Sequence, residues 1–152
     1  MRYILRNKKL SSDQTMYKVL VNVKTSNIDG KGVFAQQDIE KDTIVWQYNA
    51  GHDHAITQAE FDAKDPAEKE YLHRVAYLSP WSNLWVYPPK GDPAEYTNHS
   101  PDNNLTVRFD EDVSSEPYFI ANRDISTSEE LTNNYHEFDM ITKTTQPDWA
   151  RH

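Results

Sequence analysis

The chain has 152 residues, 37% of them hydrophobic and 26% charged, which suits one domain with a buried core. Its 16 basic and 24 acidic residues give a net charge of −8, which disfavours direct nucleic-acid binding and favours basic partners. The lack of cysteine excludes disulfides, thiolate zinc sites and cysteine nucleophiles. Without an apolar span or a signal-peptide pattern, we expect an intracellular protein with no membrane partner, cytoplasmic or, in a eukaryote, nuclear.

Alternating β-branched and aromatic residues predict strands in both halves of the chain. The predicted strands are 17–23, 43–48, 84–87, 105–109 and 118–122. Gly30 and Gly32 lie between the first two strands, where we expect a turn.

Two helix-start patterns follow and predict a helical segment over 57–78. Thr57, with a glutamate three residues later, forms a capping box, and Asp65-Pro66 places proline at the first position of a helix. Short strands on both sides of this helical segment predict a β-rich α+β fold.

Several local patterns resemble known sites but fail on context. The segment from Gly30 to Ala35 fits the GxGxxA pattern of dinucleotide sites, yet a β-branched run follows it where that site needs a helix. His52 and His54 could bind a metal, but no third ligand is obvious, so we expect no metal site. His99 is followed by serine without the GxSxG elbow of hydrolases, which leaves no basis for a catalytic triad.

Four segments together carry a more specific signal. In chain order they are SNIDGKGVFA, DTIVWQYNAG, YTNHSPDNN and ANRDISTSEELTNNY. In order and spacing they resemble the SET domain family of protein lysine methyltransferases. The resemblance covers about residues 17–138, and it leaves 1–16 as an N-terminal extension and 139–152 as a segment that closes the cofactor site. It implies a SET-like fold of several small curved sheets, with a helical insert at about 52–95 and a C-terminal pseudoknot that brings NHS beside ELTNNY.

The resemblance also implies an activity and a cofactor. The protein would transfer methyl from S-adenosyl-L-methionine to a lysine amine of a basic protein such as a histone tail, and would leave S-adenosyl-L-homocysteine. The residues it implies around the cofactor are Asp29, Gly30, Lys31, Gly32, Asn98, His99 and Tyr135. The absent side chains at the two glycines would permit a close approach of the backbone to the cofactor.

The same resemblance assigns two catalytic tyrosines. Tyr135 would orient the amine and the methyl group through its hydroxyl, and Tyr48 would line the channel that the lysine enters. Because free lysine titrates near ~10.4, it must lose a proton before it attacks, and desolvation beside a sulfonium lowers its pKa. We therefore expect the protein mainly to position the reacting groups.

The chain departs from the family pattern at several positions. Ser128 replaces the usual glycine of GEEL, and Glu95 replaces a common arginine. Asn133 lies where the family often has a phenylalanine or tyrosine that controls how many methyl groups are added, so a smaller residue in the channel suggests di- or trimethylation. The cysteine-rich zinc segment is absent, and Trp149 resembles the C-terminal tryptophan with which some members cover the adenine.

Two alternatives to lysine methylation stay open. One is a non-catalytic SET-like module that binds peptides, and the other is a methyltransferase that acts on a different side chain. The retention of Asn98, His99 and Tyr135 favours catalysis over the first alternative.

Overall fold

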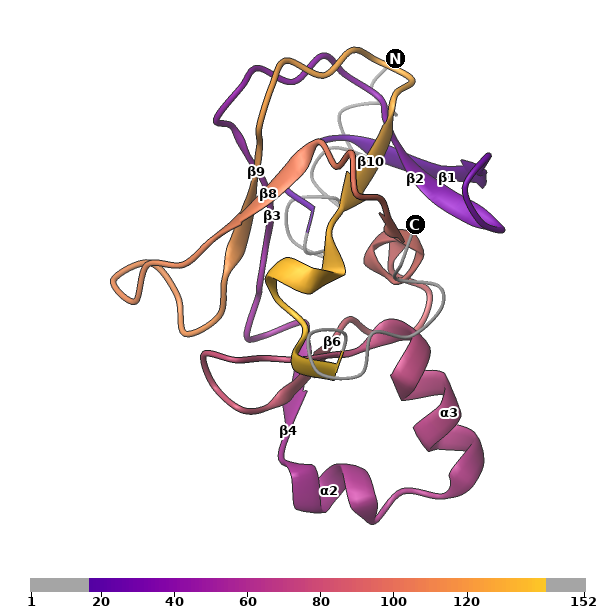
Figure 1. Ribbon diagram of the computed structural model, residues 1–152, viewed down its shortest axis with the longest axis vertical. Helices are drawn as coiled ribbons and strands as arrows, with labels where there is room; N and C mark the ends of the chain where they lie inside the picture. The colour runs from indigo at the N-terminus through magenta and orange to yellow at the C-terminus, as the bar shows by residue number, and fades with distance from the viewer. Residues whose placement is uncertain (1–16, 142–152) are drawn as a thin grey trace.

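The computed structural model describes residues 17–141 of the chain, and its strands there form three small sheets (Figure 1). Two short α-helices lie at one end of the molecule, and the hairpin of the first two strands lies toward the other end (Figure 1). The predicted β-rich α+β class is confirmed. No helix in this part of the chain is long and apolar enough to cross a membrane.

The first sheet joins segments that are far apart in the sequence. Its strands, in order, are β1 (Val21–Thr25), β2 (Lys31–Ala35), β10 (Glu130–Asn133) and β7 (Asn98–His99). Strand β10 runs antiparallel to β2 and parallel to β7, with Thr132 opposite Asn98 and Asn133 opposite His99. This pairing places NHS beside ELTNNY, as the pseudoknot implies.

The other two sheets contribute several side chains to the main core. One contains β3 (Ile44–Gln47), β9 (Tyr118–Ala121) and β8 (Leu105–Arg108), and the other contains β4 (His54–Ile56), β6 (Trp85–Tyr87) and β5 (Tyr77–Leu78). Trp46 packs edge-on against Phe119, with ring centroids 4.8 Å apart. Aromatic side chains therefore contribute to the core.

The helical region differs from the single segment predicted over 57–78. It contains α2 (Gln58–Asp62) and α3 (Pro66–Val75), with the expected capping box at Thr57 and with Asp65 as the second N-cap. Because proline cannot continue a helix, the Asp65-Pro66 start also separates the two helices. Beyond α3 the chain turns into β5, where Tyr77 pairs with Val86.

The glycine segment near the N-terminus forms more structure than the turn predicted there. The turn occupies 26–30, with Gly30 in the left-handed region at φ +46°, and β2 begins at Lys31. Tyr17, the first residue of the predicted strand 17–23, lies before β1 and forms an isolated bridge to Trp46. A fully buried Tyr17 hydroxyl is hydrogen-bonded to Thr97 Oγ1 at 2.6 Å. A short 3-10 turn, η1 (Pro93–Tyr96), leads into this residue.

Candidate active site

A cavity of about 580 Å³ lies where β7, β10 and the β1–β2 turn meet the C-terminal end of α3. The turn contributes Asp29, Gly30 and Lys31 to its wall. The paired strands and the following 3-10 turn, η2 (Tyr135–Glu137), contribute polar and aromatic side chains. The aromatic residues of the wall include Trp46, Tyr77, Phe119, Tyr135 and Phe138. A cavity of this size and lining is typical of small-molecule sites.

Asn98 ties the β1–β2 turn to the paired strands. Its Nδ2 lies 3.2 Å from the carbonyl oxygen of Asp29 and 3.1 Å from that of Lys31. The same amide nitrogen donates to Glu130 Oε2 at 2.8 Å. Asn98 therefore acts in the structure as a donor that fixes the turn at the cavity wall.

Glu130, which the sequence patterns did not single out, completes this connection. Its carboxylate accepts the Ser26 hydroxyl at 2.9 Å in addition to the amide of Asn98. A Cβ placed on Gly32 would lie 2.1 Å from Glu130 Oε2. The missing side chain at Gly32 thus makes room for Glu130, and Gly32 is not part of the cavity wall. The serine and glutamate lie 104 residues apart, which is why no local pattern indicated the pair.

Tyr135 is held at both its backbone and its hydroxyl. Its N–H donates to His99 Nδ1 at 3.1 Å, and its hydroxyl donates to the Thr97 carbonyl oxygen at 2.6 Å. Burial raises the pKa of the Tyr135 hydroxyl, and the charges of Asp139 and Asp29 raise it further. The hydroxyl therefore stays protonated and oriented at neutral pH.

Asn133 presents an unused acceptor at the cavity. The residue is 9% exposed, and its Oδ1 has no hydrogen-bond partner among the described residues. Its backbone is fixed, because its carbonyl accepts from Ser100 N at 2.9 Å and β10 pairs with β7. A buried polar atom without a partner usually indicates a ligand, a water or a functional role.

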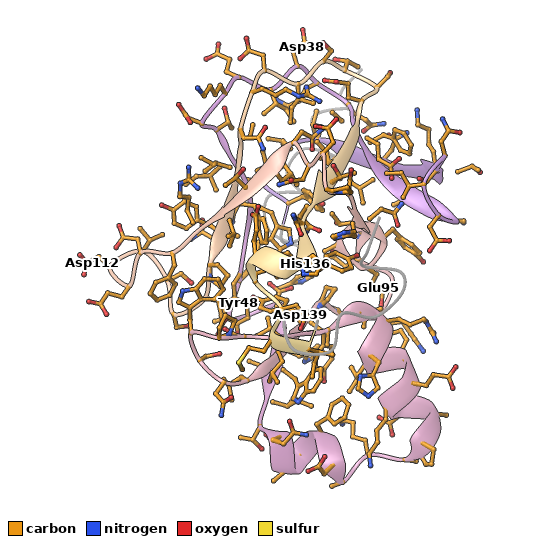
Figure 2. All side chains as sticks on the ribbon, in the orientation of Figure 1. Asp38, Tyr48, Glu95, Asp112, His136 and Asp139 are labelled. Atoms are coloured by element: carbon orange, nitrogen blue, oxygen red, sulfur yellow. The ribbon has the colours of Figure 1, made fainter. Side chains whose placement is uncertain are left out.

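Tyr48 lies just beyond β3, outside the cavity wall, and packs against the main core (Figure 2). Burial raises the pKa of its hydroxyl, and so do the charges of Asp53 and Glu116. His52, weighed as a metal ligand, is hydrogen-bonded through Nε2 to Asp92 at 2.8 Å.

Glu95, the replacement for the family's arginine, lies beside α3 (Figure 2). Its carboxylate accepts the Tyr71 hydroxyl and the N–H of Gly91. It therefore joins η1 to the helix that borders the cavity.

The structure gathers most of the residues that the resemblance assigned to the site. At the cavity wall are Asp29, Gly30, Lys31, Asn98, His99, Asn133 and Tyr135. Two of the assigned residues, Gly32 and Tyr48, are not part of that wall. Trp149 is outside the described residues. Whether the gathered residues bind a cofactor stays a prediction.

Comparisons with known proteins agree with this architecture. The SET domain family model matches residues 30–136. The chain is similar to a solved chain of Polycomb Repressive Complex 2 from Chaetomium thermophilum bound to GSK126, with a TM-score of 0.62 and 26% identity over 82% of this chain and 17% of that one. The apo complex, with substitutions in Ezh2, gives a TM-score of 0.62 and 25% identity over 82% and 16%.

The match covers less than a fifth of the length of those chains. No curated protein sequence matches the chain. The family match nevertheless extends over more than half of the chain and includes both motifs that meet at the β7–β10 pairing. The chain therefore belongs to the SET domain family, and its sheets form a SET-like fold.

Proposed function

We propose that this SET domain is an S-adenosylmethionine-dependent protein lysine N-methyltransferase that acts on a basic protein such as a histone tail. The observation that supports this most is the convergence of His99, Asn133 and Tyr135 on one cavity. They come from two segments that the parallel β7–β10 pairing brings together. A net charge of −8 favours a basic substrate.

The residues of the cavity fit S-adenosylmethionine in size and chemistry. The volume of about 580 Å³ lies within the range of small-molecule sites. Aromatic faces such as those of Trp46 and Phe119 suit a sulfonium cation, and the unpaired Oδ1 of Asn133 offers a hydrogen-bond acceptor. When bound, the cofactor supplies an electrophilic methyl group.

The chain's own contribution is to position the reacting groups. The turn that Asn98 holds would bind the cofactor through the backbone of Asp29, Gly30 and Lys31. Tyr135, fixed at two atoms, would orient the lysine amine. The surrounding aromatic side chains exclude water, which favours the neutral amine needed for attack.

Methyl transfer from labelled S-adenosylmethionine to a panel of histones and other basic proteins tests this proposal. We expect wild-type protein to label lysine, and Tyr135→Phe to lose at least about 100-fold in rate while it binds the cofactor within about threefold of wild type. The matched control is Tyr118→Phe, in a strand of the second sheet away from the cavity wall. Wild-type protein that neither binds the cofactor by calorimetry nor labels any protein would contradict the proposal.

The number of methyl groups added is a second readout of the same reaction. Asn133 is smaller than the phenylalanine or tyrosine common at its position, so we propose that the site permits di- or trimethylation. Mass spectrometry of the product, followed to completion, distinguishes the outcomes. Accumulation of monomethyl-lysine alone would overturn this part of the proposal and leave the activity itself in place.

A further inference from the structure

Two short hydrogen bonds meet at Thr97, one on its side chain and one on its carbonyl oxygen. The Tyr17 hydroxyl is hydrogen-bonded to Thr97 Oγ1 at 2.6 Å, and the Tyr135 hydroxyl donates to the Thr97 carbonyl oxygen, also at 2.6 Å. Tyr17 stands 80 residues before Thr97, and Tyr135 stands 38 residues after it. The two bonds therefore connect distant segments of the chain in one series, which ends at the tyrosine of the cavity.

Tyr17 itself is anchored in the core and is not part of the cavity wall. Its side chain is completely buried. Its backbone forms an isolated bridge with Trp46, and the N–H of the next residue, Lys18, donates to the Val45 carbonyl oxygen at 2.7 Å. Strand β3 therefore fixes the position from which the Tyr17 hydroxyl reaches Thr97.

Packing alone does not explain the Tyr17 hydroxyl. A phenylalanine ring would fill the same space without the cost of burying a polar group, and a buried hydroxyl is tolerated when it is hydrogen-bonded. Burial raises the pKa of the Tyr17 hydroxyl, the hydrogen bond with Thr97 opposes this rise, and the charges of Asp92 and Tyr135 add to it. The hydroxyl therefore stays protonated at neutral pH and keeps its bond to Thr97.

Thr97 connects this anchor to the cavity. The residue is 9% exposed, lies in the cavity wall and ends the 3-10 turn η1. Its own N–H reaches the Ala94 carbonyl oxygen only across a long hydrogen bond of 3.4 Å, so the turn by itself holds the residue weakly. The short bond to Tyr17 fixes the stiff, β-branched side chain of Thr97, and with it the direction of the carbonyl group on the same residue.

We propose that Tyr17 is a positioning residue for methyl transfer, because it holds Thr97 so that the Thr97 carbonyl oxygen keeps the Tyr135 hydroxyl in one orientation. The inference rests on the proposed function. A tyrosine hydroxyl has one hydrogen, so the bond to Thr97 uses the donor and leaves the oxygen as an acceptor. This oxygen can accept an N–H of the lysine amine and weak contacts from the C–H groups of the methyl. Loss of the Tyr17 hydroxyl should loosen this alignment and slow the reaction without weakening binding.

Two substitutions remove the same contact from its two ends. Tyr17→Phe deletes only the hydroxyl, and Thr97→Val deletes its partner but keeps a β-branched side chain. With a protein substrate that wild type methylates, each variant should lower kcat about 10-fold and leave KM for substrate and cofactor within about threefold of wild type. The double variant should be within about twofold of either single variant, because the contact is already lost in each. Thr97→Ser keeps the hydroxyl and should recover most of the rate lost in Thr97→Val.

Ile125→Val is the matched control for a loss of stability alone, because it removes one buried methyl group outside the cavity wall. It should keep kcat within about twofold of wild type, since such a deletion lowers stability without touching Thr97. Thermal unfolding checks that each variant is folded. A folded Tyr17→Phe variant with wild-type kcat would overturn the inference. Rate losses that add in the double variant would overturn it too, since Tyr17 and Thr97 would then act separately.

NMR without substrate tests the geometry separately from the proposed function. In protein labelled with ¹³C at the tyrosine ring carbon that bears the hydroxyl, the Tyr135 signal is identified by its loss in Tyr135→Phe. It should shift in Tyr17→Phe and stay in place in Ile125→Val. If wild-type protein binds no S-adenosylmethionine and transfers no methyl group, the proposed function fails, whatever the Tyr135 signal shows. If it methylates, and Tyr17→Phe changes neither kcat nor the Tyr135 signal, only the positioning role fails.

Discussion

The backbone N–H of Tyr135 donates a hydrogen bond to Nδ1 of His99 across 3.1 Å. Because Nδ1 accepts here, the neutral imidazole carries its proton on Nε2. The bond joins β7 to the 3-10 turn after β10, at the point where the two motif segments meet. In the structure His99 is thus a support for Tyr135 as well as part of the cavity wall.

His99→Ala should lower the free energy of unfolding by about 1–3 kcal/mol, because it leaves the Tyr135 N–H without its acceptor. His99→Asn should cost clearly less, since an amide oxygen can occupy the place of Nδ1. Urea unfolding of both variants at pH 7.5 measures the difference. Equal losses would mean that His99 stabilises the protein by packing alone.

Gly32→Ala tests the connection between Gly32 and Glu130. The added methyl group would overlap the Glu130 carboxylate, so we expect a loss of about 1–3 kcal/mol of stability and a weaker cofactor site, because Asn98 shares that carboxylate. Gly51→Ala is the matched control, since its Cβ would meet only Asn49 Oδ1 at 3.8 Å. Similar stabilities of the two variants would contradict this explanation for Gly32.

Sequence patterns predicted the site residues that lie within short motifs better than those whose roles depend on contacts between distant segments. The positions of Asn98, His99 and Tyr135 at one cavity agree with the motif resemblance. Glu130 and Ser26 could not be predicted, because their roles depend on a contact between residues 104 positions apart. Tyr48 lies beside the cavity wall instead of on it, a detail that depends on the packing of β3.

Part of the fold was predictable from alternating residue types, although the five-residue strand β2 was missed beside the glycines. Strands β3, β8 and β9 lie within the predicted ranges. Strands β5 and β7 have two residues each, too few for any period, and they exist because partner strands hydrogen-bond to them. The helical prediction was too long at its end, where residues 77–78 pair as β5, and it ran through the break before the second predicted start at Asp65-Pro66.

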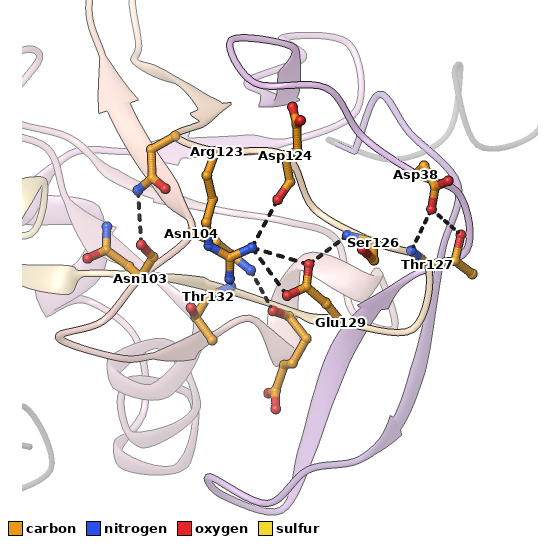
Figure 3. A network of polar contacts seen from close by, with 11 residues as sticks. Asp38, Asn103, Asn104, Arg123, Asp124, Ser126, Thr127, Glu129 and Thr132 are labelled. Carbon is orange, nitrogen blue, oxygen red and sulfur yellow. Dashed lines mark hydrogen bonds and ion pairs between the residues drawn. The ribbon is translucent and has the colours of Figure 1, made fainter.

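Ser128 shows how the chain tolerates its departure from the family's glycine. It lies at φ +80°, a region that favours glycine, in the turn that the Glu129 N–H closes onto the Ser126 carbonyl oxygen. Neighbouring side chains hold this turn in place. Asp38 Oδ1 accepts the N–H and hydroxyl of Thr127, and Glu129 accepts the Ser126 N–H and pairs with Arg123 (Figure 3).

Ser128→Gly should therefore stabilise the protein by about 0.5–1 kcal/mol, because relief of backbone strain exceeds the added chain entropy of glycine. Ser128→Ala keeps the strain and should stay within about 0.5 kcal/mol of wild type. Thermal unfolding of the two variants, measured side by side, gives the comparison. A Ser128→Gly variant no more stable than Ser128→Ala would show that the turn is unstrained.

Asp53 links stability to pH in a direction opposite to most acids. Burial raises its pKa from 3.8 to about 6, against the opposing effects of the Asn49 N–H, His52 and Lys18 and with a further increase from Asp92. The folded protein therefore holds this proton more tightly than the unfolded chain does. The resulting stabilisation is complete below pH 3.8 and is lost as the pH rises through about 6.

Asp53→Asn removes this dependence, so its stability relative to wild type should rise by ~1–3 kcal/mol between pH 4 and pH 7.5. The upper free energy corresponds to the whole shift of the Asp53 pKa from 3.8 to about 6. The lower free energy allows for screening of the charge by solvent. Urea unfolding of Asp53→Asn and wild type across this pH range measures the difference in stability. Asp38→Asn should show the opposite trend, because hydrogen bonds from Thr127 lower the pKa of Asp38. A pH-independent difference between Asp53→Asn and wild type would mean that Asp53 titrates alike in the folded and unfolded chain.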